Sequence, residues 1–248
     1  VFTKDLDIAL LNNEIDIAVH SLKDVPTILP QNIEVSAVLE RDFPQDVLVR
    51  KSSSKNKDLA ELKIATSSLR RRAFWSEKFP NTQFSDIRGN VQTRLKKLEE
   101  GDFDATLFSL AGIKRMEMGL EYEMLDFMIS APSQGVVAIS SRVDDVKTKA
   151  ILQKINHKTT QICVEIERNF LRTLEGGCTA PIGAIAVFEE NKIKFSGRLN
   201  SLDGSKTISV VEEFEYDESE NYGKKFAEFV LENGGKEMME EIKKQIKE

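Results

Sequence analysis

The sequence predicts an α/β fold followed by a smaller α+β domain. Between residues 63 and 115, apolar runs of strand length alternate with helical segments, and a polar turn separates each strand from the next helix. This repeated strand-turn-helix pattern is typical of a parallel sheet covered by helices on both faces. After residue 182, three strand-like runs joined by short turns precede two helical segments, which indicates the separate α+β domain. With 248 residues, the chain has room for two or three domains.

The first part of the chain predicts one helix, three strands and a loop. Thr3 is a candidate N-cap for a helix that ends near residues 12–13. The compact apolar run 16–19 predicts a buried parallel strand that leads into the polar segment 20–26. The other expected elements here are strands at 34–39 and 46–50 and an exposed Ser- and Lys-rich loop at 51–57.

The same periodicities predict the remaining elements. Strands are expected at 63–66, 83–87, 105–108, 126–130, 136–140, 182–188, 192–199 and 207–214. Helices are expected to begin at residues 69 and 111 and to cover 91–100, 144–155, 159–174, 218–233 and 235–247. Proline-containing segments at 41–44 and 131–135 are candidate crossings between domains.

Composition excludes several classes of protein. The net charge of -6 disfavours a nucleic-acid binder, and no apolar run is long enough to span a membrane. Two cysteines without a Cys-x-x-Cys pair, and two isolated histidines, predict neither a disulfide framework nor a metal site. A reducing cytoplasm fits this cysteine content best. Because the chain begins at Val1 without a methionine, a targeting segment is neither seen nor excluded.

Four predicted strand ends are followed by side chains that bind anions. In open α/β sheets, ligands bind at the carboxyl ends of strands, where helix N-termini present free N–H groups. Each cluster alone could be a solvated helix start, but four at equivalent places predict a ligand with several carboxylate or phosphate groups. The side chains are Ser21 and Lys23; Ser67, Ser68, Arg70 and Arg71; Arg88 and Arg94, with Gly89; and Lys114 and Arg115.

Asp24 and Cys178 are candidates for chemistry. Asp24 follows Lys23 at a strand end, where a carboxylate among cations stays ionised and can hold N–H groups or transfer protons. Its alternative roles are a turn cap or an ion-pair partner of Lys23. Cys178 lies between two glycines and a nearby proline, so we expect an accessible thiol on a turn, either reactive or idle. Cys163 has apolar neighbours at helical spacing and is expected in a core.

The same residues belong to a longer pattern that closely resembles the hydroxymethylbilane synthase family, also called porphobilinogen deaminase. Five motifs carry the resemblance, and they occur in order along the whole chain. They are His-Ser-Leu-Lys-Asp-Val-Pro at 20–26, Thr-Ser-Ser-Leu-Arg-Arg at 66–71, Arg-Gly-Asn-Val-Gln-Thr-Arg-Leu at 88–95, Ala-Gly-Ile-Lys-Arg at 111–115, and Leu-Glu-Gly-Gly-Cys at 174–178 with Pro-Ile-Gly at 181–183. The resemblance is specific up to residue 183 and weak beyond it.

The resemblance implies three domains, the first two forming a cleft like that of two-lobed solute-binding proteins. The expected division is 1–40 with 134–157, 41–133, and 158–248. It also implies a transferase that deaminates four porphobilinogen molecules and joins them into the linear tetrapyrrole hydroxymethylbilane. The implied cofactor is dipyrromethane, bound as a thioether to Cys178. A cytoplasmic monomer is expected, with porphobilinogen and the growing chain as its partners.

By the same resemblance, Asp24 is the catalytic carboxylate. The residues implied to bind cofactor and substrate are Ser21, Lys23, Thr66, Ser67, Ser68, Arg70, Arg71, Arg88, Gly89, Asn90, Arg94, Arg115 and Gln134. The family usually has Gly-Gln-Gly where this chain has Ser133-Gln134-Gly135, so we expect a stiffer crossing. Members of the family also have an N-terminal stretch before the position of Val1, and this stretch contains further carboxylate-binding residues and a mobile loop.

A non-catalytic, two-lobed binding protein for a polycarboxylate is the alternative interpretation. Such a protein would share the sheet, the cleft and the basic strand ends. It would need no tethering thiol, so the Gly-Gly-Cys segment that ends at Cys178 favours the transferase.

Overall fold

The computed structural model describes residues 3–175, 180–190 and 192–247, and these residues form three sheets. The first sheet has the strand order β1-β8-β2. Its strands are β1 (Ala18–Ser21), β2 (Ile33–Val38) and β8 (Val137–Arg142), and the helices α1 (Lys4–Leu11) and α5 (Val146–Leu152) pack against it. All of its described pairings are antiparallel.

The prediction of a buried parallel strand at 16–19 is wrong. β1 begins at Ala18 and runs antiparallel to β8, and the side chain of Val19 is exposed. The Leu22 N–H donates to the Val136 carbonyl at 2.9 Å, so β8 starts where β1 ends. The chain therefore returns from the second sheet at this end, and β8 has to run opposite to β1.

The second sheet has the order β5-β4-β6-β3-β7. Its strands are β3 (Asp46–Arg50), β4 (Ile64–Ala65), β5 (Phe84–Ser85), β6 (Ala105–Ser109) and β7 (Glu123–Met124). β4 pairs in parallel with β5 and β6, whereas β3 is antiparallel to β6 and β7. Two short 3₁₀ turns, Ser52–Ser54 and Leu59–Glu61, precede β4, and the expected exposed loop at 51–57 buries Ser54.

Helices cover both faces of this second sheet, as the strand-turn-helix pattern predicted. On one face, Leu48 shares a core with Phe74 of α2 (Leu69–Lys78). On the other face, Val47 and Val49 pack with residues of α3 (Val91–Glu100) and α4 (Leu110–Arg115). The alternation along β3 therefore builds two separate cores, which is the doubly wound arrangement.

The strand expected at 126–130 does not form. Met128 is buried in the core of the second sheet, which accounts for the apolar pattern. The Ile129 carbonyl accepts a hydrogen bond from Arg70 Nη1 at 2.7 Å, and the Ser130 carbonyl accepts one from the Ala184 N–H at 3.0 Å. The backbone of this segment is therefore satisfied by a side chain and by another sheet instead of a strand partner.

The third sheet is an antiparallel meander with the order β11-β10-β9. Its strands are β9 (Ile182–Glu189), β10 (Lys192–Asn200) and β11 (Thr207–Glu215), and its helices are α6 (Lys158–Glu175), α7 (Tyr222–Val230) and α8 (Lys236–Lys247). The core between the sheet and its helices contains Phe170, Phe195 and Phe226. The ring centroid of Phe195 lies 5.2 Å from that of Phe170 and 4.8 Å from that of Phe226. Three strands followed by two helices confirm the predicted α+β part.

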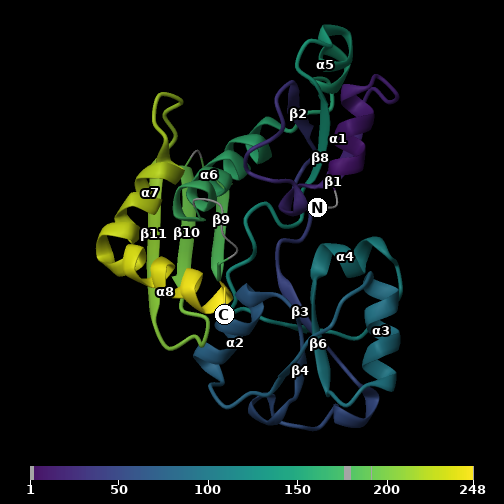
Figure 1. Ribbon diagram of the computed structural model, residues 1–248, viewed down its shortest axis with the longest axis vertical. Coiled ribbons are helices and arrows are strands. Elements are labelled where there is room, and N and C mark those ends of the chain that lie inside the picture. Colours follow the sequence, from purple (N-terminus) through teal and green to yellow (C-terminus); the bar gives the residue numbers. More distant parts are fainter. Residues whose placement is uncertain (1–2, 176–179, 191, 248) are drawn as a thin grey trace.

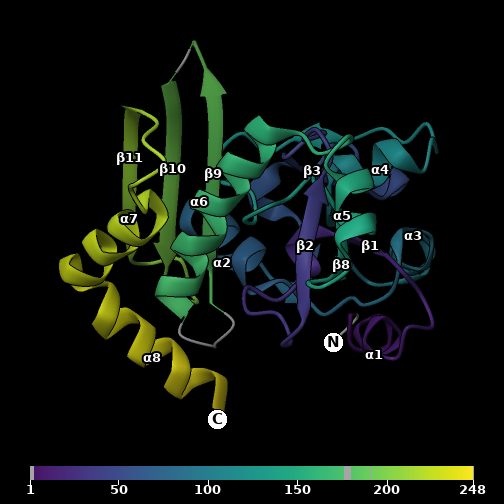
Figure 2. The same ribbon diagram turned by 90° about the horizontal axis from the view of Figure 1, so that it is seen from above.

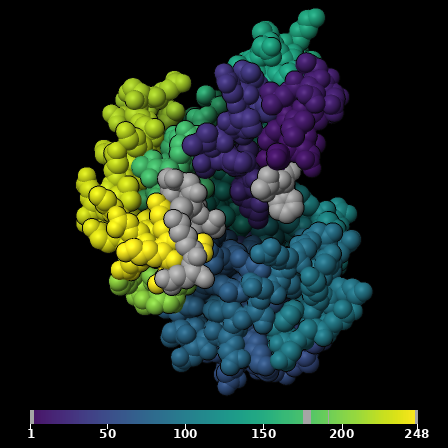
Figure 3. Space-filling model, viewed as in Figure 1, coloured from purple at the N-terminus to yellow at the C-terminus, as the bar shows by residue number. Residues whose placement is uncertain are grey.

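Two stretches, 39–45 and 125–136, connect the first sheet to the second. In Figure 1 the first sheet lies above the second, and the third sheet lies to the left with α6. Figure 2, the view from above, shows α6 running beside β9 towards the first sheet, and α6 contacts both β9 and β2. The surface in Figure 3 is hollowed between the upper and lower parts.

Candidate active site

Asp46, the first residue of β3, is a fully buried carboxylate that contacts three of the predicted site residues. Its Oδ2 accepts a hydrogen bond from Arg70 Nη1 at 2.6 Å, and its Oδ1 accepts one from Arg71 Nη2 at 2.8 Å. Gln134 Nε2, from the second crossing, also donates to Oδ1 at 3.2 Å. Burial alone would raise the pKa of Asp46, but Arg70 and Arg71 hold it well below its ordinary value. The ionised carboxylate therefore gathers side chains from two parts of the chain.

The first turn of α2 places both arginines beside this carboxylate. Ser68 is the N-cap of α2, and its Oγ accepts a hydrogen bond from the Arg71 N–H. Thr66, fully buried at the end of β4, accepts one from the Ser68 N–H at 3.2 Å. Arg70 and Arg71 are both buried, and one carboxylate neutralises only one of them. Net positive charge remains at the helix start, where a ligand carboxylate is stabilised.

Lys23 and Asp24 lie in one 3₁₀ turn, Leu22–Asp24, directly after β1. Lys23 Nζ donates to Gln134 Oε1 at 3.2 Å, so the first sheet and the second crossing meet at this amide. Burial and the charge of Arg71 lower the pKa of Lys23 to about 8, and the nearby Asp24 carboxylate partly offsets this effect. Asp24 itself is exposed. A solvent-facing carboxylate therefore lies at the edge of a crowded group of cations.

Arg94 joins the same group from α3. Its Nη2 donates to Thr106 Oγ1 at 3.0 Å and to the Leu107 carbonyl, and its guanidinium lies 4.3 Å from the ring centroid of Phe108. Burial and the charge of Arg71 lower the pKa of Arg94 to about 10. Its buried Nε has no hydrogen-bond partner among the described residues. A buried donor without a partner is a group that a ligand oxygen would satisfy.

Other predicted site residues shape the surrounding loops. Ser67 Oγ donates to the Ile87 carbonyl at 3.0 Å and accepts from the Ile87 N–H at 3.1 Å, which ties the ends of β4 and β5 together. Asn90 caps α3 by accepting a hydrogen bond from the Thr93 N–H at 2.8 Å. Gly89 has a φ of 124°, and a Cβ there would lie 2.7 Å from a side-chain carbon of Thr93, so this turn requires glycine.

Three predicted residues lie apart from the Asp46 cluster. Arg88 is exposed, and Ser21 is half-buried at the end of β1; within the described residues neither side chain forms a hydrogen bond or an ion pair with the cluster. Arg115, at the end of α4, donates to the Gly135 carbonyl at 3.3 Å and lies 3.6 Å from Asp42. Arg115 therefore contacts both crossings instead of the cluster.

Of the two cysteines, the structure describes Cys163. Cys163 is buried in the core of the third sheet, as predicted, where burial and then the charge of Glu167 raise the pKa of its thiol to about 12. A thiol with this pKa is protonated at neutral pH and is a poor nucleophile. The predicted cofactor attachment residue, Cys178, lies outside the described residues.

Glu167 of α6 joins the two crossings to the third sheet. Its carboxylate is fully buried and accepts hydrogen bonds from Arg41 Nη2 at 2.6 Å, from the Ser133 N–H at 2.6 Å and from the Ala186 N–H at 2.7 Å. Arg41 belongs to the first crossing, Ser133 to the second and Ala186 to β9. One side chain of α6 therefore fixes both connections between the first and second sheets.

Ser133 occupies a backbone conformation that favours glycine. Its φ is 67°, it is fully buried, and its Oγ has no hydrogen-bond partner in the described part of the chain. The conformation explains why glycine suits this position. The expected stiffening of the crossing by serine stays a prediction.

We expect Glu167→Gln to lower the free energy of unfolding by about 1–3 kcal/mol, because the amide cannot accept three hydrogen bonds or balance the charge of Arg41. Urea unfolding of both proteins measures the difference. Glu165→Gln, on the exposed side of the same helix, is the matched control and should change stability by less than about 0.5 kcal/mol. Equal stability of the wild type and Glu167→Gln would contradict the role of this carboxylate.

The sequence interpretation missed Asp46, Glu167 and Arg41. Asp46 begins an otherwise apolar strand, and Glu167 lies four residues after Cys163 and three before Phe170 on the apolar face of α6. A carboxylate inside an apolar pattern is a usable signal, because buried charges require partners. Arg41 carried no comparable signal.

No helix among the described residues is long and apolar enough to cross a membrane. The described side chains also contain no cluster of three or more His, Cys, Asp or Glu residues that could hold a metal ion.

Comparison with known proteins gives consistent matches. Residues 1–150 match the family model "Porphobilinogen deaminase, dipyromethane cofactor binding domain", and residues 161–232 match "Porphobilinogen deaminase, C-terminal domain". The porphobilinogen deaminase of Carboxydothermus hydrogenoformans is 40% identical, with 100% of this chain and 81% of that protein covered. The enzyme of Chlorobium luteolum is 39% identical, with 98% and 80% covered. A probable porphobilinogen deaminase of Methanocaldococcus jannaschii is 50% identical, with 77% and 66% covered.

The fold and the site together define a class: an α/β protein whose first and second sheets bring Lys23, Arg70, Arg71 and Arg94 close together. Arg70 and Arg71 pair with a buried carboxylate, and the exposed Asp24 follows Lys23. Such a group of cations suits a ligand that carries several carboxylates. The matches above show that the chain belongs to the porphobilinogen deaminase family, a family of transferases with a dipyrromethane cofactor. The predicted resemblance is confirmed, and the family favours the transferase over the non-catalytic binding protein.

Proposed function

We propose that Asp24 is the catalytic carboxylate of this chain as it joins four porphobilinogen molecules into hydroxymethylbilane. The observation that carries the proposal is the position of Asp24, exposed and adjacent to Lys23 at the edge of the cation group. The cations bind the carboxylates of the ligand, whereas the exposed Asp24 offers a negative charge that a reacting N–H group can approach from solvent. The two functions are therefore divided between neighbouring residues.

The residues of the site suit a dipyrromethane cofactor, which carries acetate and propionate groups. The donor set consists of arginines, a lysine and hydroxyl groups, which are the side chains that bind carboxylates. The Nε of Arg94, which has no hydrogen-bond partner in the part of the chain that the structure describes, offers one further buried donor. The residues that would hold cofactor and substrate are Ser21, Lys23, Thr66, Ser67, Ser68, Arg70, Arg71, Arg88, Gly89, Asn90, Arg94, Arg115 and Gln134.

The chemistry of the substrate explains the need for a carboxylate. When bound, the cofactor supplies the pyrrole carbon to which the first substrate unit is joined. Porphobilinogen loses ammonia to give a cationic, N–H-bearing electrophile, and each addition ends with the release of a proton from a pyrrole carbon. Asp24 stabilises the positive charge and exchanges protons with these groups, which are the two ways in which a fixed carboxylate lowers such barriers. Lys23 and the arginines orient the substrate by its carboxylates.

Cys178 is the proposed attachment residue. Its thiolate would form a C–S bond with the carbon from which ammonia has left, so that the loss of the C–N bond is balanced by the new thioether. The other cysteine, Cys163, is buried with a pKa of about 12 and is therefore an unsuitable nucleophile. With Cys163 unsuitable, Cys178 is the cysteine of the sequence that is left for the attachment.

The intact mass of the purified chain tests the function and the attachment together. We expect the wild type to exceed its polypeptide mass by two linked pyrrole units, and Cys178→Ser to have the bare mass. Cys163→Ser is the matched control and should retain the added mass. If the wild type has the bare mass even after incubation with porphobilinogen, the transferase proposal is wrong.

The pKa of Lys23 predicts the pH dependence of substrate binding. Lys23 is cationic below pH 8 and loses its charge as the pH rises through about 8, so the KM for porphobilinogen should rise several-fold between pH 8 and 9.5. Steady-state kinetics across this range measure the effect. Lys23→Arg stays cationic and should show a flatter profile. If the two profiles coincide, Lys23 does not bind the substrate as a cation.

We also propose the domain division 1–40 with 134–157, 41–133 and 158–248. The three separate sheets support this division. The boundary before the third domain is also supported by the two family models, because the first ends at residue 150 and the second begins at residue 161. A cytoplasmic monomer is the proposed state. Sedimentation equilibrium tests the monomeric state, and a stable dimer at micromolar concentration would contradict it.

A further inference from the structure

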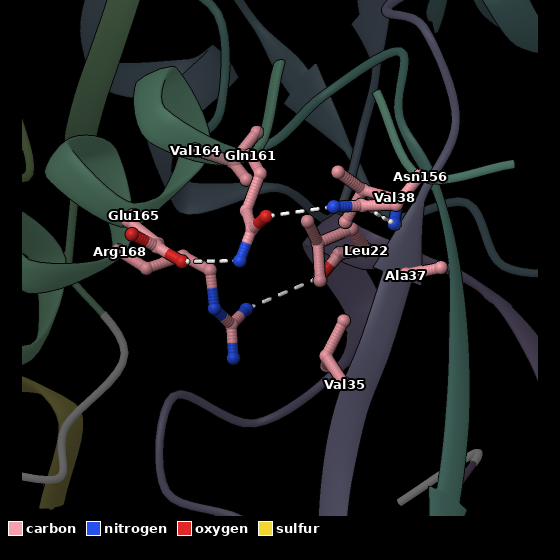
Figure 4. A pocket seen from close by; sticks show the side chains of 9 residues that line it. All are labelled: Leu22, Val35, Ala37, Val38, Asn156, Gln161, Val164, Glu165 and Arg168. Carbon is pink, nitrogen blue, oxygen red and sulfur yellow. Dashed lines mark hydrogen bonds between the residues drawn. The ribbon is translucent and has the colours of Figure 1, made fainter. Parts of the chain in front are cut away.

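The turn that carries Asp24 is held by an arginine of a different part of the molecule. Arg168, on α6, donates through Nη1 to the Leu22 carbonyl at 3.3 Å and to the Val25 carbonyl at 3.0 Å. Its Nη2 donates to the Pro26 carbonyl at 2.6 Å. One planar guanidinium therefore contacts the backbone on both sides of Asp24. Figure 4 shows the hydrogen bond between Arg168 and Leu22.

The side chains of this turn explain why its backbone position decides where Asp24 lies. Leu22 and Val25 are buried in one core together with Val164, which belongs to the same helix as Arg168. Lys23 is directed to Gln134, and Asp24 is the exposed member of the turn. Asp24 forms no side-chain hydrogen bond with any described residue, so the position of its carboxylate depends on the backbone of the turn and on the rotamer that this backbone allows.

The environment of Arg168 indicates a positional role. Arg168 lines a cavity of about 80 Å³ together with Leu22, Val35 and Val164. Figure 4 shows these side chains. Burial and the charge of Arg172 lower the pKa of Arg168 to about 10. Within the described residues its hydrogen bonds all go to main-chain carbonyls, and no carboxylate pairs with it. A half-buried cation without a counterion contributes little net stability, but its rigid fork can fix several carbonyl groups at once.

Lysine cannot replace this fork. A lysine at position 168 would present a single nitrogen, which can reach one of the three carbonyls but cannot bind all of them in a fixed plane. Arg172, one helical turn further along α6, differs from Arg168 because it donates to a single carbonyl, that of Thr27, at 2.5 Å. Arg172 thus provides a matched comparison on the same helix.

We propose that Arg168 is a positioning residue for catalysis, through which α6 of the third domain holds the Leu22–Pro26 backbone so that the Asp24 carboxylate meets the substrate. This inference rests on the proposed catalytic role of Asp24. It assigns to the third domain a task in the reaction besides carrying Cys178.

The test uses the full chain and the kinetics of hydroxymethylbilane formation. Arg168→Lys should remain folded, bind the cofactor to the same content by intact mass, and lower kcat about 10-fold to 100-fold, with KM changed less than about threefold, because a displacement of about 1 Å is enough for such a loss. Arg172→Lys should keep kcat within about twofold of the wild type. An unchanged kcat in Arg168→Lys, or equal losses in both variants, overturns the proposal.

A second comparison separates positioning from a general structural effect. Asp24→Glu already displaces the carboxylate by one methylene, so adding Arg168→Lys to it should reduce kcat by less than about threefold further. Multiplicative losses would mean that Arg168 does not act through Asp24. If Asp24→Ala retains wild-type turnover, the proposed function of Asp24 has failed; if Asp24 is required but Arg168→Lys is fully active, only the present inference has failed.

Discussion

Replacing Asp46 by alanine should lower the free energy of unfolding by about 3–5 kcal/mol, which is the usual cost of removing one partner from a buried ion pair. The side chains of Arg70 and Arg71 are both buried, and Asp46 is the carboxylate that pairs with them. Without it, two guanidinium groups lie close together with no counterion. Gln134 loses one of its acceptors as well. Urea unfolding at pH 7 measures the loss.

The control for Asp46→Ala is another aspartate that pairs with an arginine of the same helix. Asp86 pairs with Arg72 at 2.8 Å, but its side chain is 76% exposed, so Asp86→Ala should cost less than about 1 kcal/mol. The pKa of Asp46 is lowered in the folded protein, so its contribution is complete above the unfolded pKa of about 4 and is lost as the pH falls below it. Equal losses in the two variants would show that burial does not distinguish the pairs.

The sequence predicted the elements best where local periodicity and packing agree. β3 and α3 have the expected bounds, and Asn90 and Gly101 lie at the two ends of α3 as its N-cap and C-cap. The prediction of a strand at 126–130 was wrong because these apolar residues pack without a strand partner. The prediction of a parallel strand at 16–19 was wrong because the direction of a strand relative to its neighbour depends on where the chain returns. Neither property is encoded in a local pattern.

The sequence named candidate site residues one by one, but it did not predict how they are arranged in space. The motifs named Arg70 and Arg71 as ligand-binding residues, yet in the structure their first partner is Asp46, which no motif contains. Long-range pairs of this kind depend on which strands are neighbours, and a single sequence does not give that order. The contact of Arg168 with the turn of Asp24 is also a long-range contact, so the sequence did not predict it either.

Replacing Asp24 by alanine should reduce kcat by about 10²–10⁴-fold while the protein stays folded. The side chain is exposed, so its removal creates no cavity and breaks no hydrogen bond among the described residues. The cations that bind the carboxylates of the ligand remain, so KM should change much less than kcat. Turnover and KM for porphobilinogen, together with thermal unfolding, measure these quantities.

Two comparisons make the Asp24 result specific. Asp58→Ala removes another exposed carboxylate, on the loop before β4, and it should leave kcat unchanged. Asp24→Asn keeps the size of the side chain and one acceptor oxygen but removes the charge. If Asp24 acts by stabilising positive charge and exchanging protons, this variant should be nearly as impaired as Asp24→Ala. Substantial activity in Asp24→Asn would instead mean that the side chain only orients the substrate, and the catalytic assignment would have to move to another group.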